Sequence, residues 1–132
     1  MKSTIKTKYR NNGKKWYEIN YKNGNREGLY TEWYENGQKE WEGTYKNGKK
    51  EGLWSAWYEN GLKEMEWKNY KNGQLEGLHT VWYENGQKWY EVNYKNGTRE
   101  GLSTQWYEKG QKKEEGHFKN GNPEGDWIDW DE

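Results

Sequence analysis

The stretch WYENGQKEWEGTYKNGKKEGL, residues 33–53, contains two Asn-Gly dipeptides with alternating polar and apolar residues between them. Asn-Gly is the dipeptide most typical of a tight β-hairpin turn, because both residues tolerate the positive φ angles that such turns need. Trp41 and Tyr45 stand four residues apart between the two turns, which places them on one face of a strand. The stretch therefore predicts two turns joined by an extended strand.

The same pattern recurs along the chain. The turns begin at Asn12, Asn23, Asn36, Asn47, Asn60, Asn72, Asn85, Asn96, Lys109 and Asn120, each followed by Gly. The steps between them alternate between 11 and 13 residues, with one step of 12. Recurrence at a fixed period indicates a repeat protein. Gly recurs too often for helices, and no 3.6-residue periodicity is present.

We therefore expect an all-β fold: an elongated, single-layer antiparallel β-meander built from five tandem hairpin repeats. Only 29% of the residues are hydrophobic while 18% are aromatic, so a two-layer aliphatic core is excluded. The 132 residues predict one domain, residues 1–132. Its expected parts are a cap strand at residues 1–8, repeat units at 9–32, 33–56, 57–81, 82–105 and 106–129, and an acidic C-terminal cap at 123–132.

The length of the turns decides which side chains share a face. With two-residue loops, Tyr45 pairs with Lys50 and faces away from Leu53 and Trp57. With three-residue loops, Tyr45 pairs with Lys49 and shares a face with both. Because only the second arrangement gathers one apolar side, we predict three-residue loops throughout.

The predicted apolar face has one irregular unit. Its ladder comprises Tyr17, Tyr21, Leu29, Trp33, Trp41, Tyr45, Leu53, Trp57 and their counterparts up to Trp106 and Phe118. The third unit has one additional residue between Met65 and Tyr70. A β-bulge at this point would keep both side chains on the apolar face.

Charge and composition limit the classes of function. Lys+Arg and Asp+Glu both total 22, so no net charge attracts nucleic acid or an anionic membrane. Cysteine is absent and the N-terminus has no apolar signal segment, which favours a cytoplasmic location. The richness in Lys, Asn, Glu and Tyr favours an AT-rich bacterial or phage genome. We expect no membrane partner.

The recurring motifs resemble those of the MORN repeat, and more closely the shorter variant found in YwqK-type bacterial proteins, a family often described as antitoxins. The matching motifs are Trp/Tyr-Tyr-Glu-Asn-Gly, Tyr-Lys-Asn-Gly and Glu-Gly-Leu, which recur from Tyr9 to Trp130. Standard MORN units end in Gly-x-Gly, whereas this chain has Gly52-Leu53-Trp54. The resemblance implies a MORN-like solenoid that scaffolds protein contacts. Its antitoxin description implies stoichiometric inhibition of a partner protein, and a phage-encoded inhibitor of a host defence protein would use the same kind of surface.

No residue set predicts catalysis. His79 and His117 lie in different units without the spacing of a metal site, and there is no nucleophile–base pair. One Glu recurs in register in every unit, which is typical of a structural ladder rather than an acid–base pair. The recurring residues are Glu27, Glu51, Glu76, Glu100 and Glu124. We expect no enzyme activity, no metal and no cofactor.

Positions that differ between units are candidates for recognition, because the fold explains the positions that they share. In the predicted register these positions form cross-strand pairs on the face opposite the apolar ladder. They are Trp16 with Tyr30, Glu40 with Trp54, Glu64 with His79, Trp89 with Ser103, and Lys113 with Trp127, and Tyr34, Tyr58, Tyr83 and Tyr107 line one margin of that face. We interpret this face as the partner-binding surface, with exposed Trp54 and Trp89 as hot spots whose loss would leave stability nearly unchanged. The alternative is a neutral surface.

Two other kinds of ligand stay open. Lysines beside the Tyr-Lys-Asn-Gly turns, together with aromatic strands, could follow a single-stranded nucleic acid. Aromatic tracks could also bind glycans or choline in a cell wall. Another protein is the favoured partner, and the oligomeric state is left open.

Overall fold

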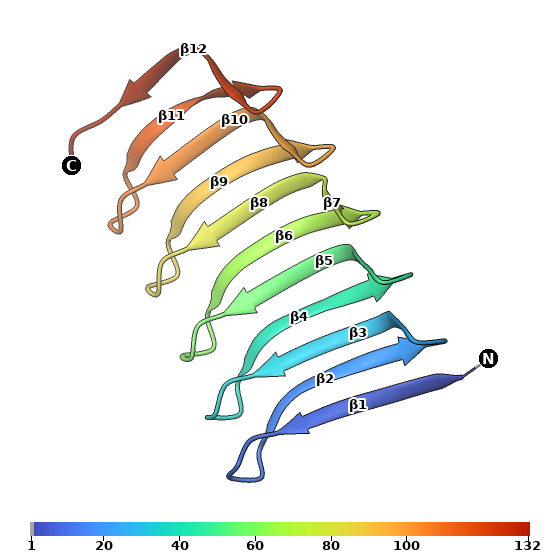
Figure 1. Cartoon of the computed structure of the whole chain (residues 1–132). Helices are drawn as coiled ribbons and strands as arrows, with labels where there is room; N and C mark the ends of the chain where they lie inside the picture. The colour runs from blue at the N-terminus through green and yellow to red at the C-terminus, as the bar shows by residue number, and fades with distance from the viewer. Residues whose placement is uncertain (1) are drawn as a thin grey trace.

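A computed structural model describes residues 2–132, which form twelve β-strands and contain no helix. The strands are β1 (Ser3–Tyr9), β2 (Lys15–Lys22), β3 (Asn25–Trp33), β4 (Lys39–Lys46), β5 (Lys49–Trp57), β6 (Lys63–Lys71), β7 (Gln74–Leu75), β8 (Gly77–Trp82), β9 (Lys88–Lys95), β10 (Thr98–Trp106), β11 (Lys112–Lys119) and β12 (Asn122–Asp129). All pair antiparallel in chain order within one sheet, where β7 and β8 both pair with β6. The sheet is one layer thick, with the two termini at opposite ends (Figure 1). The predicted all-β meander is confirmed.

The turns between these strands are of two kinds, although nearly all contain Asn-Gly. Between β4 and β5, Lys46 pairs with Lys49, and both residues of the loop, Asn47 (φ 52°) and Gly48 (φ 79°), have positive φ. This is a two-residue type I′ turn. Its counterparts at Asn23, Asn72, Asn96 and Asn120 also have positive φ. The predicted three-residue loop is therefore wrong for the Tyr-Lys-Asn-Gly turns.

The turns on the other margin do have the predicted length. Between β3 and β4, the backbone N of Tyr34 donates to the carbonyl of Gln38 at 2.9 Å, which closes a three-residue loop. Only Gly37 in this loop has positive φ (88°), as in a type I turn followed by a G1 bulge. The two kinds of turn form two separate rows along the sheet (Figure 1).

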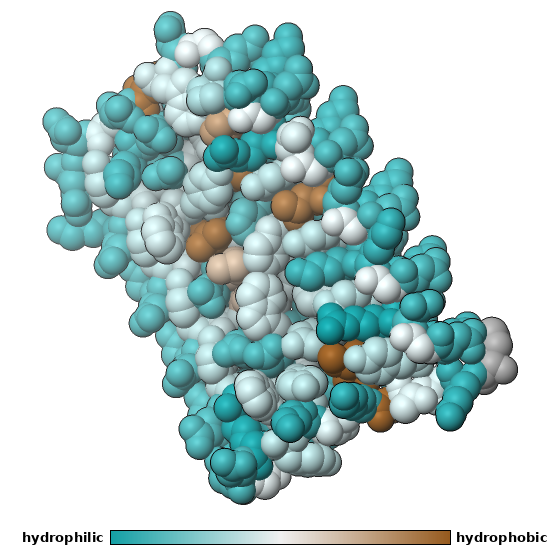
Figure 2. Space-filling model, in the orientation of Figure 1, coloured by the Kyte–Doolittle hydropathy of each residue, from teal (hydrophilic) through white to brown (hydrophobic). Residues whose placement is uncertain are grey.

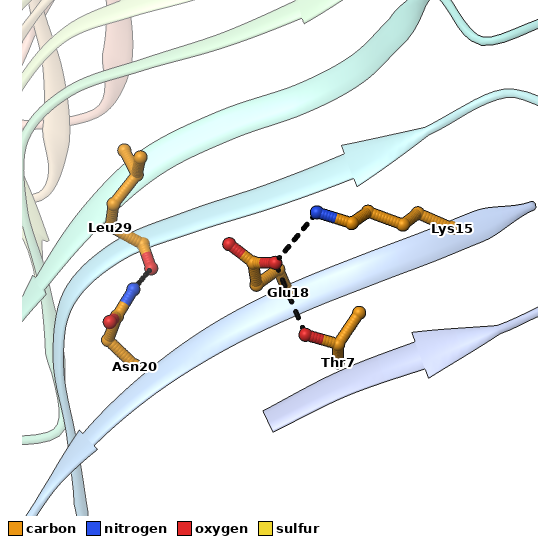
Figure 3. A network of polar contacts seen from close by, with 5 residues as sticks. All are labelled: Thr7, Lys15, Glu18, Asn20 and Leu29. Carbon is orange, nitrogen blue, oxygen red and sulfur yellow. Dashed lines mark hydrogen bonds and ion pairs between the residues drawn. The ribbon is translucent and has the colours of Figure 1, made fainter. Parts of the chain in front are cut away.

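A bulge follows each two-residue turn in the second strand of a unit. In β5, Gly52 and Leu53 have no partner in the register with β4. The bulge pushes the leucines outward: Leu53 is 51% exposed, and Leu29 and Leu102 are each 49% exposed. The prediction that these leucines join the apolar ladder is wrong. In the first unit the bulge is held by Asn20, whose Nδ2 donates to the Leu29 carbonyl at 2.7 Å (Figure 3).

The two-residue turns also change which tryptophans share a face. Tyr17, Trp41 and Tyr45 share one face as predicted, but Trp33 and Trp57 point to the other face. There Trp33 and Trp57 are covered by lysine ammonium groups, with Lys15 Nζ 5.7 Å from the centroid of the Trp33 ring. The predicted single apolar ladder is thus divided between the two sides of the sheet.

We call the side with these lysines the ion-pair face, because the same Lys–Glu pair recurs on it in every unit. The pairs are Lys15–Glu18, Lys39–Glu42, Lys63–Glu66, Lys88–Glu91 and Lys112–Glu115, with N–O distances of 2.6–3.3 Å. In the first unit Glu18 also accepts a hydrogen bond from the Thr7 hydroxyl at 3.2 Å (Figure 3). Exposed pairs of this kind contribute roughly 0–1 kcal/mol each. This face is therefore occupied by internal polar contacts.

Each unit is tied to the next by hydrogen bonds in the turns. The Tyr34 hydroxyl donates to the Trp57 carbonyl at 2.6 Å, and Tyr58, Tyr83 and Tyr107 each donate in the same way to the tryptophan one unit ahead. In the first unit Arg10 takes the place of the tyrosine, and its Nη2 donates to the Trp33 carbonyl at 2.9 Å.

The recurring Glu residues make the equivalent link on the other margin. Glu27 Oε2 accepts from the backbone N of Asn47 at 2.6 Å, and Glu51, Glu76 and Glu100 accept in the same way from the next turn. These four carboxylates have a structural role, as the sequence predicts for the ladder.

The irregular third unit behaves as predicted. Trp67 pairs with Trp54 and Tyr70 pairs with Gly52, so β6 has one residue more than β5 over this interval. The bulge keeps Met65 and Tyr70 on the same face. It also leaves Trp67 on that face, at the centre of the sheet.

Candidate functional site

The side of the sheet opposite the ion-pair face carries a continuous set of aromatic rings in contact with one another, and we call it the aromatic face. By strand register it includes Tyr17, Ile19, Tyr21, Tyr30, Trp41, Tyr45, Trp54, Met65, Trp67, Tyr70, His79, Val81, Tyr90, Val92, Tyr94, Ser103, Phe118 and Trp127. The face turned to the viewer in Figure 2 has apolar and weakly polar residues along its middle and hydrophilic margins on both sides. No second layer formed by residues 2–132 covers it.

The central part of the aromatic face is filled by rings in contact. Trp67 stacks between Trp41 and His79, with centroid distances of 5.5 and 4.7 Å. Trp54 stacks on Tyr30 at 5.9 Å, and its Nε1 donates to the Thr44 carbonyl at 3.1 Å. Such pairs contribute about 0.5–1.5 kcal/mol each beyond the area they bury.

Glycine makes room for the largest of these rings. The bulge in β5 places Trp54 against Gly43, where a Cβ would lie 2.0 Å from the indole. Trp127 covers Gly116 in the same way near the C-terminal end. Two positions of the sheet are therefore shaped for a tryptophan of the chain itself.

The C-terminal half of the aromatic face is hollow by contrast. A groove of about 850 Å³ lies over β9 to β12, and its lining includes Trp89, Tyr90, Arg99, Ser103, Gln105, Glu114, Phe118 and Trp127. A volume of this size is within the range of small-ligand sites, about 300–1,000 Å³. The groove combines aromatic walls with a guanidinium, an amide and a carboxyl group.

The structure corrects the predicted cross-strand pairs. Because the Tyr-Lys-Asn-Gly turns have two-residue loops and a bulge follows each of them, Tyr30 pairs with Ile19 rather than Trp16, and Ser103 pairs with Val92 rather than Trp89. Trp54 lies against Gly43 rather than Glu40, His79 pairs with Trp67 rather than Glu64, and Trp127 lies against Gly116 rather than Lys113. These positions lie on the aromatic face itself, so the predicted separation of recognition face and apolar ladder is wrong.

Burial separates the candidate residues into two groups. Trp54 is 2% exposed and Ser103 is 3% exposed, so the expectation that Trp54 is an exposed hot spot is wrong. Trp16 (39%) and Trp89 (45%) are exposed, and Lys113 is exposed as well. The remaining candidates are half-buried: Tyr30, Glu40, Glu64, His79, Trp127, Tyr34, Tyr58, Tyr83 and Tyr107.

Exposed Trp89 is held in a fixed position at the margin of the groove. Its ring stacks on Tyr83 with a centroid distance of 5.1 Å and an interplanar angle of 15°. The hydroxyl of Tyr83 donates to the Trp106 carbonyl at 2.7 Å, which anchors the tyrosine in turn. A flat indole is thus exposed to solvent in a fixed orientation, so its side chain loses little conformational entropy on binding.

Acidic residues lie close together on the N-terminal half of the aromatic face. Burial and a hydrogen bond shared with the Glu32 carboxyl raise the pKa of Glu40 to about 7. Burial, with the nearby Glu84 charge, also raises the pKa of Glu64. Burial and the charges of Glu40, Glu64 and Glu59 raise the pKa of Tyr34 to about 12.

A second pair of carboxyl groups lies beside the groove. Burial and a hydrogen bond with Asp129 raise the pKa of Glu114. Among residues 2–132 no group of three or more His, Cys, Asp or Glu side chains has the geometry to hold a metal ion. The described residues also include no helix long and apolar enough to cross a membrane.

Sequence reasoning missed part of the lining of the groove. The sequence places Tyr90 and Phe118 in the apolar ladder, and its candidate binding residues do not include Arg99, Gln105 or Glu114. The signal was available in the comparison between units, because Glu114 stands where other units have Tyr17, Trp41, Met65 and Tyr90.

Comparison with known proteins supports the reading of the repeats. A family model described as MORN repeat variant matches residues 5–23, 26–47, 75–96 and 99–120. The longest unmatched interval, residues 48–74, contains the bulged strand β6. Among curated proteins nothing matches the chain. Repeats of this family form non-enzymatic modules that often bind proteins or membranes.

Proposed function

Because the chain belongs to the MORN repeat variant family, we propose that it is a protein-binding module whose contact surface is the aromatic face. The observation that carries this proposal is the exposed Trp89 beside a groove of about 850 Å³ on a sheet that has no second layer. Trp and Tyr in such positions dominate the free energy of many protein interfaces.

The electrostatics favour a protein over a membrane or a nucleic acid as the ligand. The chain has no net charge, so it lacks the long-range attraction that anionic headgroups and phosphates exert on basic proteins. Its lysines on the ion-pair face are engaged with glutamates of the same strand. A mixed aromatic and polar surface of this composition is typical of protein interfaces.

We further propose that binding inhibits the partner stoichiometrically, in the manner of an antitoxin or of a phage inhibitor of a host defence protein. The support is the resemblance to antitoxin-type repeat proteins, together with an elongated surface that could cover the active site of another protein. Such an inhibitor needs no chemistry of its own, only a face that excludes the partner's substrate.

The test begins with the immobilised full chain and an extract of its source cells. Captured proteins are identified by mass spectrometry, purified and titrated by calorimetry. We expect a 1:1 complex that persists at 0.5 M salt, a concentration chosen to screen simple charge attraction to about a 4 Å Debye length. Capture of nucleic acid, or of lipid vesicles instead of a protein, would contradict the proposal.

Variants locate the surface. Trp89→Ala should weaken binding at least about tenfold, equal to about 1.4 kcal/mol. Leu53→Ala is the matched control, because Leu53 is similarly exposed (51%) but protrudes from a bulge remote from the groove. If the partner is an enzyme, its activity should fall linearly to an end point at one equivalent of the chain. Equal affinities of the partner for wild type and Trp89→Ala would contradict the proposal that the aromatic face is the contact surface.

A further inference from the structure

One position of the repeat differs from its counterparts in size. The residue that follows Glu-Gly-x in each unit is Tyr30, Trp54, His79 or Trp127, but in the fourth unit it is Ser103. In the four other units this residue lays a ring over the neighbouring strand: Tyr30 and Trp54 stack on each other, His79 stacks on Trp67, and Trp127 covers Gly116. The fourth unit therefore lacks one ring of the row.

The missing ring coincides with the groove. Ser103 is part of the lining, and it pairs with Val92 on β9 and with Gly116 on β11, so small side chains lie on both sides of it. Tyr90, Phe118 and Trp127 supply rings around this place. The first unit shows what the site would hold, because there Tyr30 lies opposite Ile19 as Ser103 lies opposite Val92.

A cation already lies beside the empty position. In the second unit Lys50 Nζ is 4.7 Å from the centroid of the Trp54 ring, four residues further along the same strand. Arg99 stands at the equivalent place before Ser103, and its guanidinium lies 4.4 Å from the Phe118 centroid. An aromatic ring placed over Ser103 would lie within reach of this cation, which favours the face of a π system.

The border of the groove carries a pair of carboxyl groups. Glu114 is part of the lining, and it pairs with Asp129 across β11 and β12. Within the groove the Glu114 carboxyl is hydrogen-bonded to Asp129. A ligand with positive charges on either side of its ring would complement this border.

We propose that the groove at Ser103 binds one aromatic side chain of a partner protein, presented in a basic segment. The ring of the partner takes the place that a ring of the chain itself takes in the other four units. This inference rests on the proposed function and names the group that the partner contributes.

The experiment uses capped tripeptides as probes and the full chain labelled with ¹⁵N. We expect Lys-Trp-Lys to shift the amide resonances of Ser103, Gln105 and Tyr90 in a saturable way, with a dissociation constant below about 10 mM. Lys-Ala-Lys should cause no saturable shift at these amides. Glu-Trp-Glu should bind at least fivefold more weakly than Lys-Trp-Lys.

Filling the position from within should exclude the probe. Ser103→Tyr introduces the residue found at the equivalent position Tyr30, and Ser103→His introduces the residue found at His79. Both side chains are thus already accommodated at this position in other units of the sheet. Both variants should lose the saturable shifts by at least tenfold in affinity while their melting temperatures stay equal or rise. Asn93→Tyr is the control, because Asn93 is exposed, points to the ion-pair face and should leave the peptide affinity unchanged.

Several results would overturn the inference. They are shifts confined to other strands, no saturable shift at about 10 mM Lys-Trp-Lys, equal binding of Glu-Trp-Glu, and unchanged binding by a folded Ser103→Tyr or Ser103→His variant. A partner that is captured equally by wild type and these variants would refute this inference but leave the proposed function intact. If no protein is captured at all while the peptide still binds, the proposed function is refuted, but the inference that the groove binds an aromatic side chain is retained.

Discussion

The centre and the C-terminal half of the aromatic face are built from the same repeat, yet one is filled and the other is open. At the centre, Trp54 sits on Gly43 and is 2% exposed. In the C-terminal half the equivalent residue is Ser103, a small side chain that is 3% exposed and forms part of the lining of the groove. A single repeat position thus decides whether a unit contributes to stability or to binding, because a ring from the chain and a ring from a ligand compete for the same place.

The largest effect should come from emptying the filled half. Trp54→Ala removes a buried indole and its hydrogen bond, and we expect a loss of about 3–5 kcal/mol in the free energy of unfolding. Urea denaturation followed by circular dichroism measures this loss. Trp89→Ala provides the comparison, and we expect less than about 1 kcal/mol from this exposed ring. Equal losses for the two variants would contradict the distinction between the halves.

A smaller change at the same place should act through sterics. A Cβ on Gly43 would lie 2.0 Å from the Trp54 ring, so Gly43→Ala should displace the indole. We expect a loss of about 1–3 kcal/mol, typical of overpacking. The double variant Gly43→Ala/Trp54→Ala should lose less than the sum of the two single losses, because the clash partner is gone. Additive losses would show that the indole does not lie over Gly43.

The hydrogen bonds between units should matter more inside the sheet than at its end. Tyr58→Phe removes the bond to the Trp82 carbonyl, which is partly buried, and should cost about 1 kcal/mol. Tyr107→Phe removes the equivalent bond to the Trp130 carbonyl, which is exposed and can accept from water, so its cost should be a few tenths of a kcal/mol. Thermal unfolding of both variants tests the order, and a larger loss for Tyr107→Phe would be inconsistent with it.

The smallest effect concerns the carboxyl pair Glu32 and Glu40, and it depends on pH. Burial and the neighbouring carboxyl raise the pKa of Glu40 from its ordinary value of 4.5 to about 7. Between these two values the folded state holds a proton that the unfolded state has released, so stability falls as pH rises through this window. Glu40→Gln should therefore raise the melting temperature by a few degrees at pH 8 and leave it nearly unchanged at pH 4. A gain that is equal at both pH values would show that charge on Glu40 is not the cause.

The sequence was sufficient to predict the strands, the turns and the absence of helices, because period-2 alternation and Asn-Gly act locally. It was insufficient for the register, because Lys46-Asn47-Gly48 and Glu35-Asn36-Gly37 contain the same dipeptide but form turns of different length. The backbone bulge at Gly52 was equally hidden.

The same cause explains why the sequence could not place the candidate site residues relative to one another. Comparison of the units singled out Ser103 and Trp89, which both line the groove, but the wrong register placed them opposite each other. Burial of Trp54 could not be inferred either, because it depends on Gly43 lying directly across from it. The strand register, and not the repeated motif, decides which large and small side chains face one another across neighbouring strands.

The hydroxyl-to-carbonyl links run only from one unit to the next, which has a consequence for how the chain opens. An internal unit is hydrogen-bonded to a neighbouring unit on each side, whereas the first and last units have a neighbouring unit on one side only. Local unfolding should then start at the two ends of the sheet and proceed inward. Backbone amides near β5 and β6 should therefore exchange their protons with solvent most slowly. The groove lies over strands near the C-terminal end, where opening begins. A ligand bound there should stabilise these strands and slow the hydrogen exchange of their backbone amides.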